Sequence, residues 1–242
     1  YTIKNLYIYN TDTYYTGLFA SVGENGVVKN LELADVKIFG ANYVGGIAGL
    51  SFGSIIDCEV SGNITYVPAN DYQVYIGGIA GRGSLDKCNS AVEIKVFGFN
   101  SNCYVGGLTG YATSKTISDS SNIGNISVIT DKLARANVGG LVGCEVSSST
   151  TITSSYNTGS ITVDSGGRTY VGGLVGAGSS ITSSYNTGSI TVDSGGSTYV
   201  GGLMGSDSSS ATITSSYNTG AITVNSGSDS STYVGGLAGY GS

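Results

Sequence analysis

The chain contains no histidine and no tryptophan, and its 242 residues include one proline, one methionine and only 11% charged residues. Without histidine there is no Ser-His-Asp or Cys-His catalytic pair, no histidine-ligated zinc and no imidazole general base. Basic residues are scarce, because ten Lys and Arg stand against sixteen Asp and Glu and give a formal net charge of −6. Affinity for nucleic acid depends on clustered Lys and Arg, so we expect no nucleic-acid partner.

Long hydrophobic runs are missing as well. No stretch reaches the roughly 18 consecutive apolar residues of a membrane-spanning helix, so we expect no membrane insertion in this segment. Residues 1–5 do not form the basic and apolar regions of a signal peptide, and the chain does not begin with Met. We therefore expect a fragment of a longer protein, in which residues 1–242 form a single repeat domain.

Glycine is abundant, with 40 residues, and much of it lies in a recurring doublet that is followed by Leu or Ile. Successive doublets are 32, 29, 33, 33, 29 and 34 residues apart, and a degraded copy at residues 14–20 precedes them. A fixed period in this range is typical of a solenoid, in which each unit buries its apolar face only against its neighbours. The seven doublets begin at Gly45, Gly77, Gly106, Gly139, Gly172, Gly201 and Gly235.

Each repeat also carries short β-branched runs that alternate with period two and are bounded by Gly, Ser and Asn, which is a strand signal. Clear examples are Ile152-Thr153 and Ile161-Thr162-Val163. About three short strands per coil predict an all-β fold, a right-handed parallel β-helix of seven to eight coils of roughly 30 residues. The alternative is an antiparallel sandwich or a propeller, but a propeller blade of four strands usually needs about forty residues.

Two motifs predict how each coil turns. The Asn of Tyr-Asn-Thr-Gly (Asn157, Asn186 and Asn218) lies between two strands. Because Asn and Gly tolerate positive φ, we expect a coil corner there, whose Asn side chains form a ladder. No helix follows the glycine doublets to bind a phosphate. We expect the doublets at a tight bend or a close approach of two backbones.

Two of the four cysteines, Cys58 and Cys88, occupy the same repeat position, where later copies have Ser. Neighbouring parallel strands place such residues about 4.8 Å apart. That spacing is within reach of a disulfide, but the side chains run side by side, which suits the required dihedral angle poorly. We expect stacked free thiols, with a disulfide as the alternative. Cys103 and Cys144 fall in different columns and give no pairing signal.

A tyrosine column is the candidate binding site. Tyr precedes Val-Gly-Gly or Ile-Gly-Gly in six copies, and Asn137 is the exception. This column is either an aromatic stack within the wall or an exposed strip that binds a glycan or a protein, and we favour the structural role. The six residues are Tyr43, Tyr75, Tyr104, Tyr170, Tyr199 and Tyr233.

The two halves of the chain differ in regularity. Residues 1–138 form irregular coils, whereas the coils of 139–242 are nearly identical, since segments 153–174 and 182–203 differ at one position in 22. A catalytic site needs one unique constellation of groups with separated pKa values. Faithful repetition therefore excludes such a site from the C-terminal half.

Acidic residues of the N-terminal half are the remaining catalytic candidates: Glu24, Glu32, Asp35, Asp57, Glu59, Asp71 and Glu93. Asp57 and Glu59 would project two carboxylates onto one face, as in an acid/base pair. Two carboxylates on one strand are more often its solvated side. The sequence also lacks the Asp column of a calcium-binding β-roll. We expect no enzyme, no catalytic residue, no metal and no cofactor.

The segments Tyr170–Gly176, Val138–Gly143 and Tyr43–Gly49 resemble the GLUG motif of bacterial surface proteins, and 3–8 and 28–33 resemble the lead-in that precedes such repeats. The resemblance covers essentially the whole chain. It implies a place in large secreted or wall-anchored proteins, including adhesins and the non-catalytic regions of IgA-specific metallopeptidases. The peptidase motif His-Glu-x-x-His is absent from a chain without histidine, so the resemblance does not imply proteolysis.

These observations predict a non-enzymatic, extracellular structural or adhesive module, a rigid stalk or binding shaft on the bacterial cell surface. Its expected partners are a host glycan, a host protein or its own chain end to end, and repeated columns would bind a repetitive partner through avidity. One alternative is a carbohydrate-active β-helix that uses carboxylates of the N-terminal half. Another is a fibre subunit that stacks end to end through exposed β edges.

Overall fold

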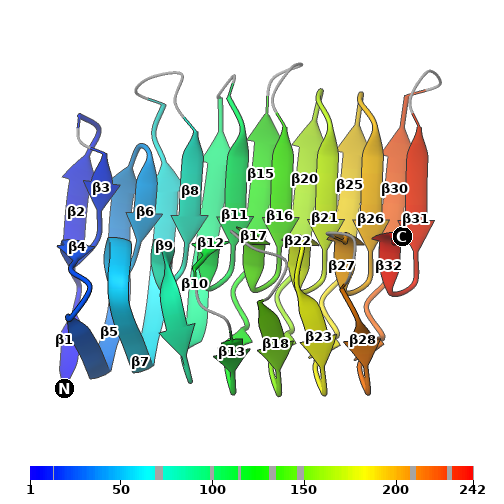
Figure 1. Cartoon of the computed structure of the whole chain (residues 1–242). Coiled ribbons are helices and arrows are strands. Elements are labelled where there is room, and N and C mark those ends of the chain that lie inside the picture. The colour runs from blue at the N-terminus through cyan, green and yellow to red at the C-terminus, as the bar shows by residue number, and fades with distance from the viewer. Residues whose placement is uncertain are drawn as a thin grey trace.

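The computed structural model describes residues 1–12, 14–68, 73–98, 101–113, 116–130, 135–145, 150–207, 211–227 and 231–241. These residues form 32 strands and no helix, and the strands stack in parallel as a β-solenoid of about seven turns (Figure 1). No helix in this part of the chain could span a membrane. The all-β parallel β-helix is thereby confirmed.

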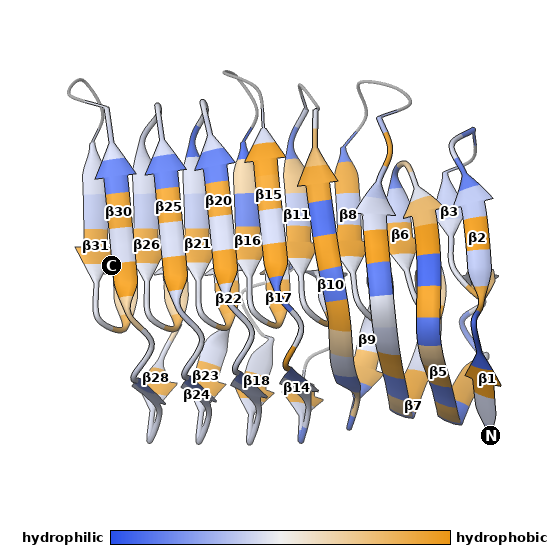
Figure 2. Ribbon diagram, turned by 180° about the vertical axis from the view of Figure 1, so that it is seen from behind, coloured by the Kyte–Doolittle hydropathy of each residue, from blue (hydrophilic) through white to orange (hydrophobic). Residues whose placement is uncertain are grey.

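The coils wind with a right hand. In Figure 2 the near strands β20 (Ile161–Ser165) and β25 (Ile190–Ser194) point upward, and the chain then crosses to the far wall. The chain meanwhile advances from the N-terminus on the right to the C-terminus on the left. Upward on the near side with a leftward advance is a right-handed coil, as the general preference for right-handed crossovers predicts.

One C-terminal coil shows how the repeat is built. It contains β21 (Thr169–Gly172), β22 (Val175–Ala177), β23 (Ser180–Thr182), β24 (Tyr185–Asn186) and β25. The three expected strand segments are present. The structure adds two divisions, because the doublet separates β21 from β22 and the Tyr-Asn pair forms its own short strand.

Each strand pairs in register with its counterpart one coil away, for example Tyr170 with Tyr199 and Ile161 with Ile190. The pairings join three sheets. One has eight strands: β3 (Tyr15–Thr16), β6 (Tyr43–Gly45), β8 (Val74–Gly77), β11 (Cys103–Gly106), β16 (Ala136–Gly139), β21, β26 (Thr198–Gly201) and β31 (Thr232–Gly235). One has four: β13 (Thr116–Ser118), β18 (Thr151–Thr153), β23 and β28 (Ile213–Thr214).

The third sheet has 20 strands and covers the remaining wall: β1 (Thr2–Lys4), β2 (Tyr7–Asn10), β4 (Phe19–Val22), β5 (Val27–Gly40), β7 (Ala48–Tyr66), β9 (Ala80–Asp86), β10 (Asn89–Phe97), β12 (Thr109–Ala112), β14 (Ser121–Asn122), β15 (Ile126–Thr130), β17 (Val142–Glu145), β19 (Tyr156–Asn157), β20, β22, β24, β25, β27 (Met204–Ser206), β29 (Tyr217–Asn218), β30 (Ile222–Ser226) and β32 (Ala238–Tyr240). Its N-terminal members are long, because β5 has 14 residues and β7 has 19. These strands pass continuously through positions at which the later coils are broken into separate strands.

The core consists of aliphatic columns that run along the solenoid. Buried aliphatic side chains stack on their equivalents in the next coil, which no single coil could do alone. Burying one Leu, Ile or Val side chain contributes about 1.5–3 kcal/mol. One such column, with exposures of 0–1%, is Ile64, Ile94, Ile126, Ile161 and Ile190.

The glycine doublets mark a close approach of backbones, as expected. A Cβ atom on Gly172 would lie 1.9 Å from the carbonyl oxygen of Val175 in the same coil. A Cβ atom on Gly173 would lie 2.1 Å from the carbonyl oxygen of Gly202 and 2.5 Å from Cγ of Asn186. Neither glycine has positive φ. The doublet therefore needs glycine because there is no space for a side chain, and its backbone conformation does not itself require glycine.

The corner differs from the prediction in one respect. The Asn of Tyr-Asn-Thr-Gly does not adopt positive φ; the residue three positions earlier does, at φ 48° for Ser154 and Ser183 and 49° for Ser215. Earlier coils have Asn30, Asp57, Lys87 and Asp119 in this column, all with positive φ. The expectation of a left-handed Asn was wrong, because the backbone turns three residues earlier, at the Ser position.

The predicted Asn ladder is confirmed. Nδ2 of Asn122 donates to Oδ1 of Asn157 at 2.9 Å, and the same bond joins Asn157 to Asn186 and Asn186 to Asn218 at 2.8 Å. Each Nδ2 also donates to a carbonyl two residues on, as Asn157 does to Gly159 at 2.9 Å. The first three side chains are fully buried, so these bonds satisfy amides that water cannot reach.

Cys58 and Cys88 are buried free thiols in register, as expected. The Cys88 thiol donates to the carbonyl of Asp86 at 3.2 Å, and in the later coils the Ser120 hydroxyl makes the equivalent bond to Ser118 at 2.7 Å. The neighbouring Cys88 thiol lowers the pKa of Cys58 to about 7, and Cys58 together with burial raises the pKa of Cys88. The column is a hydrogen-bonding wall position that accepts either residue type.

Candidate functional site

The predicted tyrosine column forms two ring stacks on the eight-stranded sheet. Ring centroids of Tyr43 and Tyr75 lie 4.6 Å apart, and those of Tyr75 and Tyr104 lie 5.0 Å apart. Further along, Tyr199 stacks on Tyr170 at 4.8 Å and on Tyr233 at 5.1 Å. Register pairing thus brings together all six tyrosines that the sequence singles out, in two groups of three.

Asn137 interrupts the column, and an arginine covers the gap. The guanidinium carbon of Arg135 lies 4.5 Å from the ring centroid of Tyr170, and its Nε donates to Oδ1 of Asn137 at 3.3 Å. A planar guanidinium over an aromatic face is attractive. Nδ2 of Asn137 is buried and has no hydrogen-bond partner among the described residues.

Burial limits what this column offers to a ligand. Tyr75 is 8% exposed and Tyr170 is 9% exposed, and the edge of Tyr111 packs against Tyr75 and Tyr104. Burial raises the pKa of Tyr75, Tyr104 and Tyr111.

A shallow recess of about 260 Å³ opens beside the column and is lined by Tyr14, Asn42, Tyr43, Gln73 and Tyr75. Tyr43 lies between Tyr15 and Tyr75, and Tyr75 lies between Tyr43 and Tyr104. A molecule in this recess would therefore touch ring edges, because neighbouring tyrosines occupy the ring faces. A ligand role for this column stays a prediction.

A second tyrosine column lies on the opposite side of the turn, and sequence reasoning missed it. Tyr156, Tyr185 and Tyr217 stack at 5.0 and 5.1 Å with rings within 4° of parallel. The signal was present, because these are the tyrosines of the Tyr-Asn-Thr-Gly motif. The alternating strand placed the Asn inward, and the Tyr beside it therefore faces out.

This column changes character toward the N-terminus. Register places Ser121 beside Tyr156, Asn89 beside Ser121 and Glu59 beside Asn89. The row thus runs from carboxylate through amide and hydroxyl to three stacked phenol rings. The ring of Tyr156 has Tyr185 on one face and only the small Ser121 side chain beyond the other.

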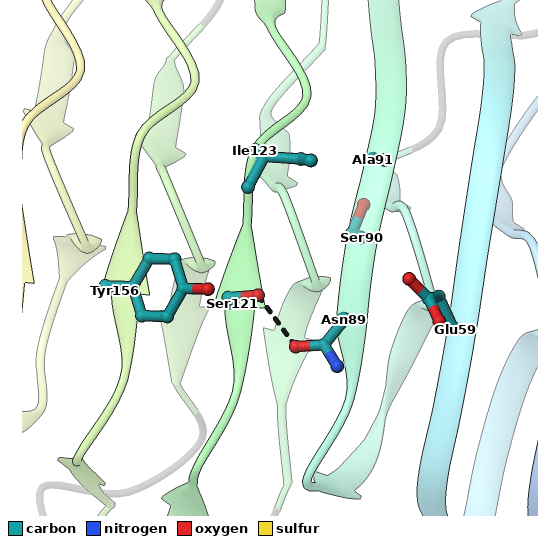
Figure 3. Close-up of a pocket in the computed structure, with 7 residues that line it drawn as sticks. All are labelled: Glu59, Asn89, Ser90, Ala91, Ser121, Ile123 and Tyr156. Atoms are coloured by element: carbon teal, nitrogen blue, oxygen red, sulfur yellow. Dashed lines mark hydrogen bonds between the residues drawn. The ribbon is translucent and has the colours of Figure 1, made fainter.

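A recess of about 240 Å³, which we call the notch, lies where the column changes. Figure 3 shows its lining residues: Glu59, Asn89, Ser90, Ala91, Ser121, Ile123 and Tyr156. The Ser121 hydroxyl donates to Oδ1 of Asn89 at 2.7 Å, which fixes the amide and leaves its Nδ2 available to donate. The carboxylate of Glu59 and the phenol of Tyr156 bond to no other described group. The notch therefore combines one uncovered aromatic face with a donor and an acceptor.

Asp57 and Glu59, the two carboxylates considered as an acid/base pair, occupy different settings in the coil. Glu59 borders the notch, whereas Asp57 occupies the positive-φ corner at φ 49°. Asp71 lies outside the described residues. Among the residues that the structure describes, no group of three or more Cys, Asp or Glu side chains is arranged to hold a metal ion.

Comparison with known proteins identifies the repeat. The family described as "The GLUG motif" matches residues 40–65, which include β6 and most of β7. Halomucin of Haloquadratum walsbyi (strain DSM 16790 / HBSQ001) is 38% identical over 80 residues, which are 33% of this chain and 1% of that protein. No solved structure matches. The chain carries the GLUG motif that its sequence predicts, and it spans about 1% of the length of this curated relative.

The two matches indicate a repeat module of a surface protein in an extracellular setting. The relative is archaeal, so the bacterial origin expected from the resemblance stays a prediction.

Proposed function

We propose that this chain is a non-enzymatic module of an extracellular surface protein, a rigid shaft whose side face is adhesive. The observation that carries the proposal is the in-register pairing of eight consecutive coils along one sheet. Each coil is held to the next by backbone hydrogen bonds on several walls at once, so bending the shaft would break ladders on its stretched side. A stack of this kind holds its ends at a fixed separation.

Buried side-chain ladders support the same role. The Asn ladder joins four coils within the wall, and Ser155 and Ser184 link their coils through a backbone N–H to Oγ bond of 3.1 Å. Polar networks that are fully satisfied specify one register, because a slip would leave buried amides unpaired. Similarity to a segment of Halomucin and the GLUG motif support a setting in a large surface protein.

Stiffness is tested by single-molecule energy transfer between dyes attached enzymatically at the two ends, which spares the four cysteines. Eight coils at about 4.8 Å each predict one narrow distribution near 35–40 Å. An unstructured chain of this length would give a broad distribution around roughly 85 Å. A broad distribution under native conditions would overturn the shaft.

Adhesion and catalysis are tested with the same protein. Beads coated with the module should bind members of an array of glycans and extracellular host proteins, and beads coated with heat-unfolded module serve as the control. Equal retention of both bead types would contradict an adhesive face. New reducing ends after incubation with polysaccharides would instead favour a carbohydrate-active β-helix. Light scattering that grows with concentration would favour end-to-end fibres.

A further inference from the structure

We propose that the notch binds one neutral pyranose ring of a glycan, stacked on the uncovered face of Tyr156. This inference deepens the adhesive part of the proposed function by naming the site and the ligand class. It rests on the notch alone and requires nothing of the buried first tyrosine column.

The ligand position follows from the geometry of the second column. Tyr156 and Tyr185 are parallel within 3° at 5.0 Å, so Tyr185 covers one face of Tyr156. The other face has no ring in the next row, which holds Ser121, and Figure 3 shows the hydroxyl end of Tyr156 lying toward that residue. Ser121 is too small to fill that row. The recess is therefore the place of a missing ring, and a flat ligand there would sit at ordinary stacking distance from Tyr156.

The polar lining suits hydroxyl groups. A sugar hydroxyl is both donor and acceptor, and the notch offers Nδ2 of Asn89 as donor and the Glu59 carboxylate as acceptor. Hydrogen bonds from hydroxyls to a carboxylate are among the stronger neutral-to-charged contacts. The bond from Ser121 to Asn89 holds the amide in place before any ligand arrives, which reduces the entropy lost on binding.

The charge and the size of the notch exclude other classes of ring-shaped ligand. Glu59 and the net charge of −6 repel phosphates and acidic sugars. A free aromatic ligand would offer no hydroxyl groups to the Glu59 carboxylate and the Asn89 amide of the notch, whereas a sugar ring would. Its volume of about 240 Å³ lies below the roughly 300–1,000 Å³ of pockets for larger ligands, so it holds a single sugar ring. An open, shallow site of this kind predicts a Kd of about 1 mM for one ring.

The test is saturation-transfer NMR with methyl glycosides of glucose, galactose and mannose as neutral probes, and with methyl glucuronide and sialic acid as anionic probes. At least one neutral glycoside should receive saturation at the protons of one ring face. Tyr156→Ala should weaken that binding by about tenfold or more. Tyr217→Ala is the matched control, because it removes the ring at the other end of the same column and should leave binding unchanged.

A filling variant keeps the test independent of folding. Ser121→Tyr adds the missing ring, so it should abolish sugar binding while the far-UV circular dichroism and the thermal midpoint stay near those of the natural protein. Glu59→Gln should weaken binding several-fold by removing the charged acceptor.

Three results would overturn the inference: no transfer to any neutral glycoside, equal losses in Tyr156→Ala and Tyr217→Ala, or tighter binding of the anionic probes. Each of these leaves the energy-transfer and bead experiments untouched. If the notch fails while the beads still bind with Tyr156→Ala, the proposed function stands and the adhesive site lies elsewhere. If the distribution of end-to-end distances is broad, the rigid-shaft proposal is wrong regardless of the sugar-binding results.

Discussion

The first coils and the last coils enclose the same kind of core but turn their corners with different chemistry. In the first, β5 and β7 run unbroken through the corner, and the inward corner residue is the buried Val60. In the last, the strands are short, and the same position holds Asn157 or Asn186 in the hydrogen-bonded ladder. Figure 2 shows the outer contrast, with hydrophilic bands along β5 and β10 and pale bands along β20, β25 and β30.

Both regions use the second glycine of the doublet in the same way. A Cβ atom on Gly46 would lie 2.6 Å from a methyl group of Val60, and one on Gly140 would lie 2.5 Å from Cγ of Asn157. The glycine thus makes room for the corner residue, whichever it is. The aliphatic columns and the doublet are therefore the fixed requirements of the coil, whereas the corner can be apolar or polar if its groups are satisfied.

Substitution of the glycine doublet, which both regions share, should therefore destabilise the protein most. Gly172→Ala places a methyl group where the Val175 carbonyl lies, and we expect a loss of about 3 kcal/mol or more in the free energy of unfolding. Urea unfolding followed by circular dichroism measures it. Gly195→Ala is the control, because its nearest atom would be 3.4 Å away, and its change should stay within about 1 kcal/mol. Equal effects at both glycines would refute the close-approach argument.

The polar corner should be the next most sensitive feature. Asn157→Ala leaves Nδ2 of Asn122 without its acceptor and the Gly159 carbonyl without its donor, and we expect a loss of about 2–3 kcal/mol. Asn218→Ala removes the last rung of the ladder, which is partly exposed, and should cost about 1 kcal/mol. If the two variants unfold at the same urea concentration, the ladder is not a source of cooperative stability.

Alkaline pH should destabilise the region of buried phenols around Tyr75. Burial raises the pKa of Tyr75, Tyr104 and Tyr111, so these groups keep their protons in the folded state while the unfolded chain ionises near pH 10. Their stabilisation is complete below pH 10 and is lost as pH rises toward the folded pKa. Each phenol contributes at most about 1.4 kcal/mol per pH unit.

Thermal midpoints between pH 7 and pH 11.5 should fall above pH 10, and Tyr75→Phe should reduce the slope. Tyr233, which is 42% exposed in the same column, gives the control variant Tyr233→Phe, whose slope should match that of the natural protein. A flat profile, or the same change in both variants, would contradict the prediction.

Exchanging a residue type between the two regions should change the stability least. Cys88→Ser places the later coils' residue in an early coil, where a hydroxyl would donate to the Asp86 carbonyl and accept from the Cys58 amide. We expect a change within about 1 kcal/mol, because the geometry of the column already suits Ser. Cys103→Ser is the comparison, since Cys103 is fully buried in a different column, and it should destabilise the protein clearly more.

Periodicity in the sequence was enough to predict the coil count, the parallel pairing and the inward columns, because each depends on many residues that repeat. It failed at single positions. The sequence pattern could not show that Ser183, and not Asn186, has positive φ. Which of the two residues does so depends on where the backbone turns relative to the buried Asn amide. The sequence did not predict the notch, because its residues come from four coils and share no motif. Only their common register makes neighbours of Glu59, Asn89, Ser121 and Tyr156.

The Asn ladder has a direction, since in each of its three bonds the amide of one coil donates to the Oδ1 atom of the next coil toward the C-terminus. A coil with Asn at this position therefore fits before or after any other such coil. A gene encoding it can grow by copying whole repeats, without compensating changes at the junctions. The near-identity of residues 153–174 and 182–203 is the record that recent copying would leave.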